Sequence, residues 1–157
     1  DSFGFNEKGV GIYKFDLTSG KGGPCSEELF NFANGMCLSP NGDYLYVVES
    51  FHPCISRLPI NSDGTFGKKE IFTENIATVP DGLAFDKEDN LFISCYEPSR
   101  IYISDSKGST RLLIEDKHCT TLAHPTNISL SEDGKTMYTA NLGRWHITEI
   151  DISSLYN

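Results

Sequence analysis

The sequence predicts an all-β protein, a partial β-propeller built from four-stranded antiparallel blades. Three observations lead to this prediction: a repeat of about 46 residues, short apolar segments separated by turn-forming residues, and the absence of sustained helical periodicity. The chain has 157 residues, so it holds between three and four such repeats. Four short strands in each repeat are typical of a propeller blade.

The repeat is visible in apolar residues that recur at a constant interval. Leu45 and Leu91 are 46 positions apart, and Met137 follows after another 46. The same interval separates Tyr46, Phe92 and Tyr138, and also Ile55, Ile101 and Ile147. A β-sandwich is the alternative all-β fold, but a sandwich does not repeat its turn chemistry in register. The constant interval therefore favours the propeller.

The repeat divides the chain into four consecutive parts of one partial propeller domain, residues 1–157. Residues 1–31 are predicted to be the last two strands of one blade. Residues 32–77 and 78–122 are predicted to be complete blades, and residues 123–157 an incomplete last blade of three strands. Together these parts predict roughly 13 strands.

Within a repeat, each strand is a short apolar segment bounded by polar turns. Gly, Asn and Asp in these turns supply the positive φ angles that tight hairpins need. The second strands are apolar on both faces, which predicts that they pack between two neighbouring sheets. The expected segments are first strands at 36–38, 83–85 and 128–130, second strands at 44–48, 91–94 and 136–140, third strands at 55–60, 101–104 and 147–152, and fourth strands at 69–72 and 111–114.

Roughly 13 strands do not close a ring of four-stranded blades. Two arrangements would close it: a longer native protein of which this chain is the C-terminal half, or a homodimer in which two copies form one ring. The chain starts at Asp1 without an initiator Met. We therefore expect a processed or truncated chain.

The charge and cysteine content exclude several classes of protein. With 22 Asp and Glu against 13 Lys and Arg, the net charge is −9, which repels nucleic acid and favours cations. No apolar segment approaches the about 18 residues of a membrane helix. The five cysteines show neither a disulfide framework nor paired zinc spacing, so they are expected to be buried, reduced thiols. We therefore predict a cytoplasmic protein.

Two residues at the same repeat position are candidate metal ligands. Asn34 and Asp81 are predicted to lie in loops at the entrance to innermost strands, where their side chains converge near the propeller axis. Their oxygen atoms suit a hard cation such as Ca²⁺ or Mg²⁺. In the alternative interpretation, Asn-Gly and Asp-Gly are only turn formers. Thr126, at the third equivalent position, is a poor ligand.

Further residues on the same face are candidates for substrate binding: Glu49, Tyr96, His124 and Arg144. Three of them have an alternative interpretation without a functional role. Glu49 is then a solvated loop acid, His124 a packing histidine, and Arg144 a structural residue stacked on the single Trp145.

Several segments resemble one known family when they are taken in order. They are Ala33 to Gly42 followed by Tyr44 to Val47, then Val79 to Asp86, Asn90 to Tyr96, Pro125 to Ile128 and Ala140 to His146. This series is similar to the senescence marker protein/gluconolactonase family, the regucalcin-like six-bladed propellers. The resemblance covers essentially the whole chain, but only the second half of a family member, which implies about half of a six-bladed propeller.

The resemblance implies a divalent metal on the axis, with Ca²⁺ preferred over Mg²⁺ or Zn²⁺. Its ligands would be a Glu from the first blade, an Asn that maps to Asn34, and an Asp that maps to Asp81. The Glu, and a further Asn, belong to blades outside this chain. The resemblance also implies hydrolysis of sugar lactones or related esters, with Asp81 as the catalytic residue. The alternative function is a non-catalytic propeller that binds a ligand or a protein.

Overall fold

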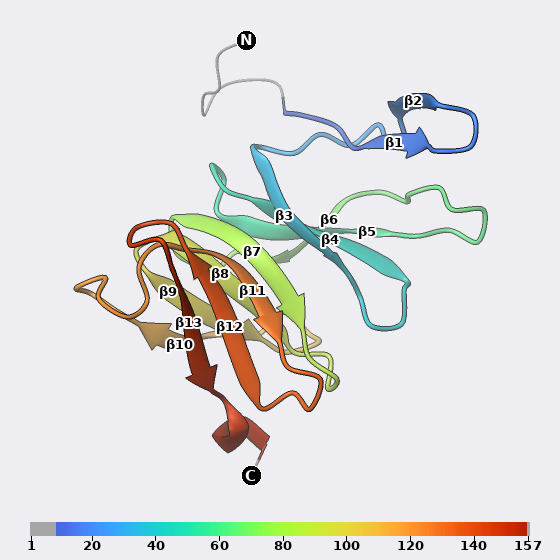
Figure 1. Cartoon of the computed structure of the whole chain (residues 1–157). Coiled ribbons are helices and arrows are strands. Elements are labelled where there is room, and N and C mark those ends of the chain that lie inside the picture. Colours follow the sequence, from blue (N-terminus) through green and yellow to red (C-terminus); the bar gives the residue numbers. More distant parts are fainter. Residues whose placement is uncertain (1–8, 157) are drawn as a thin grey trace.

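A computed structural model describes residues 9–156 of the chain. This part contains thirteen strands in four antiparallel sheets, followed by one 3₁₀ turn, η1 (Ser153–Tyr156) (Figure 1). The all-β prediction is therefore confirmed. Residues 1–8, which belong to the first predicted blade segment, lie outside the described residues.

The four sheets follow one another along the chain, and within each of them neighbouring strands are consecutive in sequence. Two outer sheets have two and three strands, and the two sheets between them have four each. The strands are β1 (Tyr13–Asp16) and β2 (Lys21–Pro24); β3 (Ala33–Leu38), β4 (Tyr44–Glu49), β5 (Cys54–Pro59) and β6 (Glu70–Thr73); β7 (Val79–Phe85), β8 (Leu91–Glu97), β9 (Arg100–Ser104) and β10 (Thr110–Glu115); β11 (Pro125–Leu130), β12 (Thr136–Asn141) and β13 (His146–Asp151).

The hairpins between first and second strands repeat their chemistry. Gly42 and Gly134 both have positive φ angles, 78° and 73°, and each donates its N–H to a serine carbonyl three residues earlier. A residue with a side chain is strained in this conformation, and glycine is not.

The second strands β4 and β8 are buried on both faces, as predicted. One apolar cluster packs between the two four-stranded sheets and includes Val48 and Ile93. Another packs between the second of these sheets and β11–β13, and includes Phe92 and Met137. By contrast, Tyr138 on β12 is exposed, because it lies on the outer face of the last sheet.

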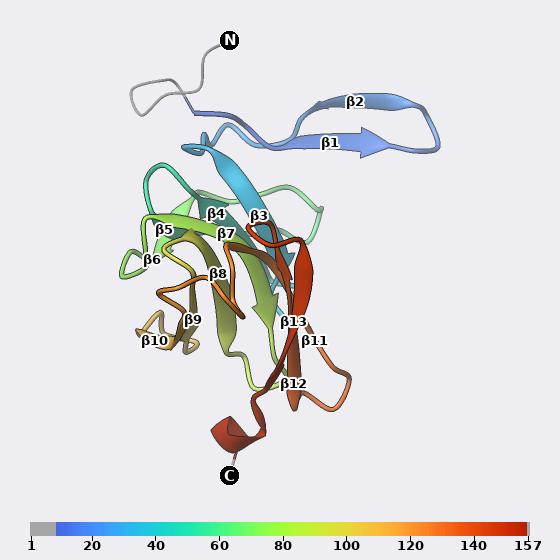
Figure 2. The same ribbon diagram turned by 60° about the vertical axis from the view of Figure 1, so that its left-hand side comes forward.

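The first strands of the three larger sheets lie side by side. β3 packs against β7, and β7 packs against β11. The β1–β2 hairpin extends away from these sheets in both ribbon views (Figures 1 and 2). Among the described residues, no helix is long and apolar enough to cross a membrane.

The first strands begin earlier than the sequence predicted. β3, β7 and β11 start at Ala33, Val79 and Pro125, so Asn34 and Asp81 lie within strands and not in loops. The prediction was wrong here because the strands continue on both sides of these polar residues: Ala33 and Met36 pair with β4, and Pro80 and Leu83 pair with β8.

Candidate functional site

A β-bulge interrupts each of the three first strands at the same repeat position. In β3, Asn34 and Gly35 together oppose the single residue Val48, because Ala33 pairs with Glu49 and Met36 pairs with Val47. The register of β11 also shifts, between Pro125 and Asn127. Bulges of this kind are common beside active sites because they redirect a side chain.

In β7 the bulge is formed by Asp81 and Gly82, which oppose Ser94. The Ser94 hydroxyl accepts the Gly82 N–H at 3.0 Å and so satisfies a backbone donor that the bulge displaces. The turn-forming interpretation of the two dipeptides is therefore wrong. Gly35 and Gly82 lie inside strands, and neither has a positive φ angle.

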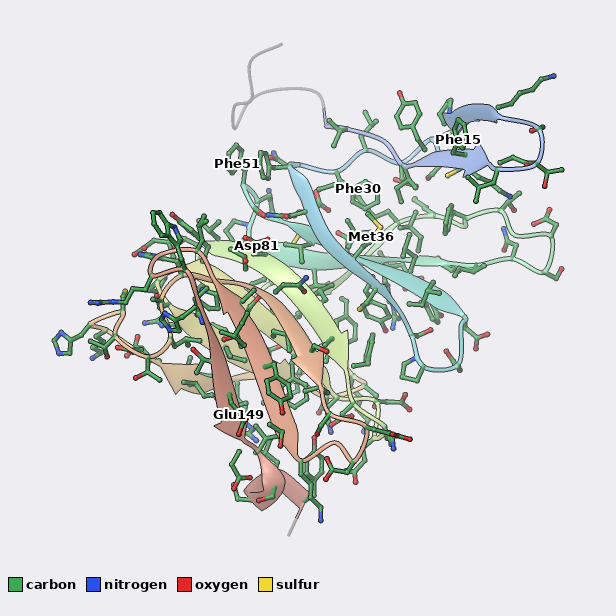
Figure 3. The ribbon with its side chains drawn as sticks, in the orientation of Figure 1. Phe15, Phe30, Met36, Phe51, Asp81 and Glu149 are labelled. Carbon is green, nitrogen blue, oxygen red and sulfur yellow. The ribbon has the colours of Figure 1, made fainter. Side chains whose placement is uncertain are left out.

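Both bulge glycines are required by close backbone contacts between the sheets. A Cβ atom on Gly35 would lie 2.1 Å from the Asp81 carbonyl oxygen. A Cβ atom on Gly82 would lie 2.7 Å from the Thr126 carbonyl oxygen. These contacts bring the three equivalent positions together, and Figure 3 shows Asp81 near the beginning of β7. The backbone segments of Asn34 and Asp81 are therefore adjacent, and the convergence of their side chains stays a prediction.

The buried residue Ser50 links Asn34 to the strand that carries Asp81. Its hydroxyl donates to the Pro80 carbonyl at 2.7 Å and accepts from Asn34 Nδ2 at 3.3 Å. Because the single hydroxyl proton is used on Pro80, the Asn34 amide must present its NH₂ group to Ser50. Asn34 Oδ1 is then the oxygen that remains for a ligand. Sequence reasoning did not single out Ser50, and its only signal was its position directly after Glu49.

The Asp81 carboxylate is half-buried without compensation. Desolvation is the cause that raises its pKa above the ordinary value of 3.8. Within residues 9–156, no hydrogen bond or ion pair offsets this burial. A desolvated carboxylate without a partner is a candidate functional group, because natural structures otherwise pair such charges.

In donor type, these residues fit a hard cation. Asn34 Oδ1 and the Asp81 carboxylate are oxygen donors, and the cation would supply the positive charge that Asp81 lacks. These two residues alone supply fewer ligands than a Ca²⁺ or Mg²⁺ ion needs, so they form only part of a metal site. In the described part of the chain, no three His, Cys, Asp or Glu side chains form a group that could hold a metal ion.

Glu49 lies at the end of β4 and is only 5% exposed. One carboxylate oxygen accepts the Asn31 N–H at 2.6 Å. The other accepts the Ser56 hydroxyl at 2.5 Å and forms an ion pair with Lys69 at 3.1 Å. The interpretation of Glu49 as a solvated loop acid was wrong. Both of its oxygens bind within the protein, so Glu49 stabilises this sheet and is not open to a substrate.

Tyr96 and His124, two of the predicted substrate-binding residues, lie together. Their rings are in contact, with centroids 4.7 Å apart and planes tilted by 31°, and His124 Nδ1 lies 2.8 Å from the Tyr96 carbonyl oxygen. Glu97 Oε2 lies 3.3 Å from the same nitrogen. Sequence reasoning missed Glu97, although it directly follows Tyr96.

Arg144 lies in the exposed turn between β12 and β13. Its Nε donates to the Cys119 carbonyl at 2.5 Å, which ties this turn to the loop that precedes β11. Trp145 is 90% exposed, and no cation–π contact joins it to Arg144 in the part of the chain that the structure describes. The predicted stacking alternative is therefore wrong.

All five cysteines are free, as predicted, but only Cys54 and Cys95 are buried. The other three are partly buried. Burial raises the pKa of the Cys37 thiol and of the Cys95 thiol to about 12. These two thiols are therefore protonated near neutral pH and are poor nucleophiles.

Successive antiparallel sheets with their first strands side by side, and bulged polar residues where those strands meet, define a propeller-type fold with a candidate ligand site at its centre. Comparison with known proteins gives the family. Residues 3–127 match the model of the SMP-30/gluconolactonase/LRE-like region, and the chain belongs to this family. A gluconolactonase from Zymomonas mobilis subsp. mobilis is 34% identical over 116 residues, which are 67% of this chain and 31% of that protein.

Solved structures share the fold at lower identity. A gluconolactonase from Xanthomonas campestris superposes with a TM-score of 0.67 at 18% identity, over 82% of this chain and 40% of that one. A calcium-binding protein, regucalcin, from Agrobacterium tumefaciens gives 0.66 at 20% identity, over 85% and 45%. A luciferin-regenerating enzyme gives 0.65 at 18%, over 87% and 44%. The chain thus spans less than half the length of each of these relatives.

Proposed function

We propose that this chain is part of a metal-dependent hydrolase that opens sugar lactones or related esters. The observation that carries the proposal is the half-buried Asp81 carboxylate, which has no partner among the described residues and lies in a repeated bulge beside Asn34. Membership of the gluconolactonase family supports the reaction type.

In this proposal, Asn34 Oδ1 and Asp81 bind a divalent cation, with Ca²⁺ preferred over Mg²⁺ or Zn²⁺. A bound cation of this kind polarises the lactone carbonyl. Ser50 orients the Asn34 amide through its hydroxyl. Burial raises the pKa of Asp81, which makes its carboxylate a better proton acceptor for an attacking water than an exposed aspartate.

The remaining ligands would come from outside the chain. We propose that residues 1–157 form one partial domain of a six-bladed propeller, with blade boundaries near residues 31, 77 and 122. Additional blades of a longer protein would supply the missing Glu and Asn, or a second copy of the chain would close the ring. The five free cysteines support a cytoplasmic location. Light scattering distinguishes the two arrangements, since a chain that stays monomeric at low micromolar concentration contradicts the homodimer.

The proposed ligand is tested with Asp81→Asn and the matched control Asp89→Asn, which removes the same charge in an exposed turn. Asp89 already has a φ of 62°, a conformation that Asn tolerates. With only two ligands, we expect the chain to bind Ca²⁺ at about millimolar concentration in calorimetry. Asp81→Asn should weaken this binding about tenfold or more, whereas Asp89→Asn should not change it.

The reaction is tested by pH-stat titration of D-glucono-1,5-lactone hydrolysis with added Ca²⁺, Mg²⁺ or Zn²⁺. Hydrolysis that Asp81→Asn abolishes and Asp89→Asn preserves supports the proposal. Metal binding without hydrolysis in any closed assembly of the chain favours a non-catalytic binding scaffold. Equal loss in both variants means that Asp81 is not the ligand.

A further inference from the structure

The imidazole of His124 is held from three sides. The Tyr96 ring contacts it at a tilt of 31° with ring centroids 4.7 Å apart, and the Tyr96 carbonyl and the Glu97 carboxylate both approach Nδ1. On its opposite edge, a Cβ atom on Gly143 would lie 2.3 Å from His124 Cδ2, so only a glycine leaves room for the ring there. Two separate segments, residues 96–97 and the turn that contains Gly143, thus contact the ring.

The backbone of His124 is constrained as well. Its φ angle is 53°, a conformation that is uncommon for a residue with a side chain. Its N–H donates to the Ser99 hydroxyl at 2.9 Å, and its carbonyl accepts the Leu142 N–H at 3.1 Å. Non-glycine residues in this conformation cluster at functional sites.

These contacts determine the tautomer of the ring. A backbone carbonyl and a carboxylate can only accept hydrogen bonds, so Nδ1 must carry the proton. In the neutral imidazole, Nε2 is then an acceptor with a fixed direction. Nε2 has no hydrogen-bond partner within residues 9–156, and the His124 side chain is 26% exposed. A ligand can therefore reach it.

The segments that carry His124 and Tyr96 adjoin the candidate site. His124 is two residues before Thr126, whose carbonyl contacts Gly82, the residue after Asp81. Tyr96 follows Cys95, which pairs with Pro80, the residue before Asp81. Both segments that carry the ring contacts are thus neighbours of Asp81 in the fold.

We infer that His124 is a specificity-determining residue whose Nε2 accepts a hydrogen bond from a hydroxyl group of the substrate, with Glu97 as its positioning residue. This inference rests on the proposed lactonase function. It makes the preferred substrates polyhydroxylated lactones, as opposed to unsubstituted ones, because a site built around a fixed acceptor discriminates against a ligand that lacks the donor.

The geometry is tested first in the full chain, without any need for activity. Long-range ¹H–¹⁵N spectra should show His124 in the Nδ1–H tautomer, and Glu97→Ala should raise the fraction of the Nε2–H tautomer, because the Tyr96 carbonyl alone then accepts the Nδ1 proton. On addition of D-glucono-δ-lactam, a stable polyhydroxylated analogue, the Nε2 resonance should shift. The unsubstituted δ-valerolactam should leave it unchanged. An Nε2–H tautomer overturns the inference.

The specificity is tested with His124→Phe and His124→Asn, because the second variant tolerates the positive φ angle if the first does not fold. The control is His118→Phe, a change of an exposed histidine in the loop that precedes β11. We expect both His124 variants to lower kcat/KM for D-glucono-1,5-lactone about tenfold relative to δ-valerolactone, mainly through KM, with no change in the control.

The outcomes separate the inference from the proposed function. Hydrolysis of both lactones with an unchanged preference in the His124 variants overturns the inference and leaves the lactonase proposal standing. An equal loss of kcat for both lactones also overturns it, because that pattern indicates a proton-transfer role. Absence of hydrolysis in every assembly overturns both.

Discussion

Glu49 and Asp81 are two acidic residues in successive sheets, and both are shielded from water. They differ in whether other residues pair with their carboxylates. Glu49 has partners for both of its oxygens, including the ammonium group of Lys69. Asp81 has none among the described residues, and desolvation raises its pKa. The residues around Glu49 thus compensate its negative charge, whereas the described residues around Asp81 do not compensate the charge of Asp81.

The comparison separates a structural acid from a candidate functional one. Buried charges in proteins are usually paired. An unpaired buried charge lowers the free energy of unfolding, and a ligand that binds the folded state raises it again. Burial alone would not have distinguished the two residues, since both have lost water contacts. Their partners distinguish them.

The largest expected effect is the loss of stability in Glu49→Ala. Removal of this carboxylate leaves the Lys69 ammonium group without its counter-charge and the Asn31 N–H without its acceptor, and we expect the free energy of unfolding to fall by about 3 kcal/mol. Asp81→Ala, measured in chelator, should change it by less than about 1 kcal/mol. Urea denaturation of both variants checks this. Similar losses in the two variants would remove the distinction between the two acids.

The next effect concerns how Asp81 is positioned, since its side chain has no hydrogen bond to any residue within 9–156. Gly35→Ala places a Cβ atom 2.1 Å from the Asp81 carbonyl oxygen and should destabilise the chain by about 2 kcal/mol. Gly23→Ala is the control, because nothing lies within 4 Å of its Cβ position. If Gly35→Ala keeps both its stability and its Ca²⁺ affinity, backbone contact does not position Asp81.

The smallest effect is a pH dependence of stability in chelator. Because the pKa of Asp81 is raised by folding, the folded chain binds this proton more tightly than the unfolded chain does. Asp81 therefore lowers stability at neutral pH, and this penalty disappears as the pH falls through the raised pKa toward the ordinary value of 3.8. Asp81→Asn should exceed the wild type in stability at pH 7, and the difference should shrink toward pH 4. A difference that is constant with pH contradicts the assignment.

Most of the fold could be predicted from the repeat, because apolar periodicity reports burial directly. Val48 and Ile93 lie in second strands that are buried on both faces, as their sequence indicates. The starts of β3 and β7 could not be predicted in this way. Asn34 and Asp81 are polar residues inside strands, and a bulge breaks the alternation that would otherwise reveal pairing.

The site could be predicted only in part. The equivalence of Asn34 and Asp81 followed from spacing, but the contrast between Glu49 and Asp81 did not. It depends on Lys69, which is 20 positions from Glu49 along the chain, directly before β6, and reaches Glu49 only when β6 pairs with β5 and β5 pairs with β4. The contact between His124 and Glu97 is equally non-local, since it joins two different sheets.

The repeated bulge has a consequence for how such a protein diversifies. In β3 and β7 the bulge depends on glycine and on backbone contacts, and the side chain before the glycine makes little contribution to folding: Asn34 makes one hydrogen bond, to Ser50, and Asp81 makes none to the described residues. Successive repeats accordingly place an amide at Asn34, a carboxylate at Asp81 and a hydroxyl at Thr126 in one equivalent socket. Each repeat thus has an equivalent bulge position next to the neighbouring sheets. A single codon change there can exchange one donor for another while the sheet that presents it stays the same.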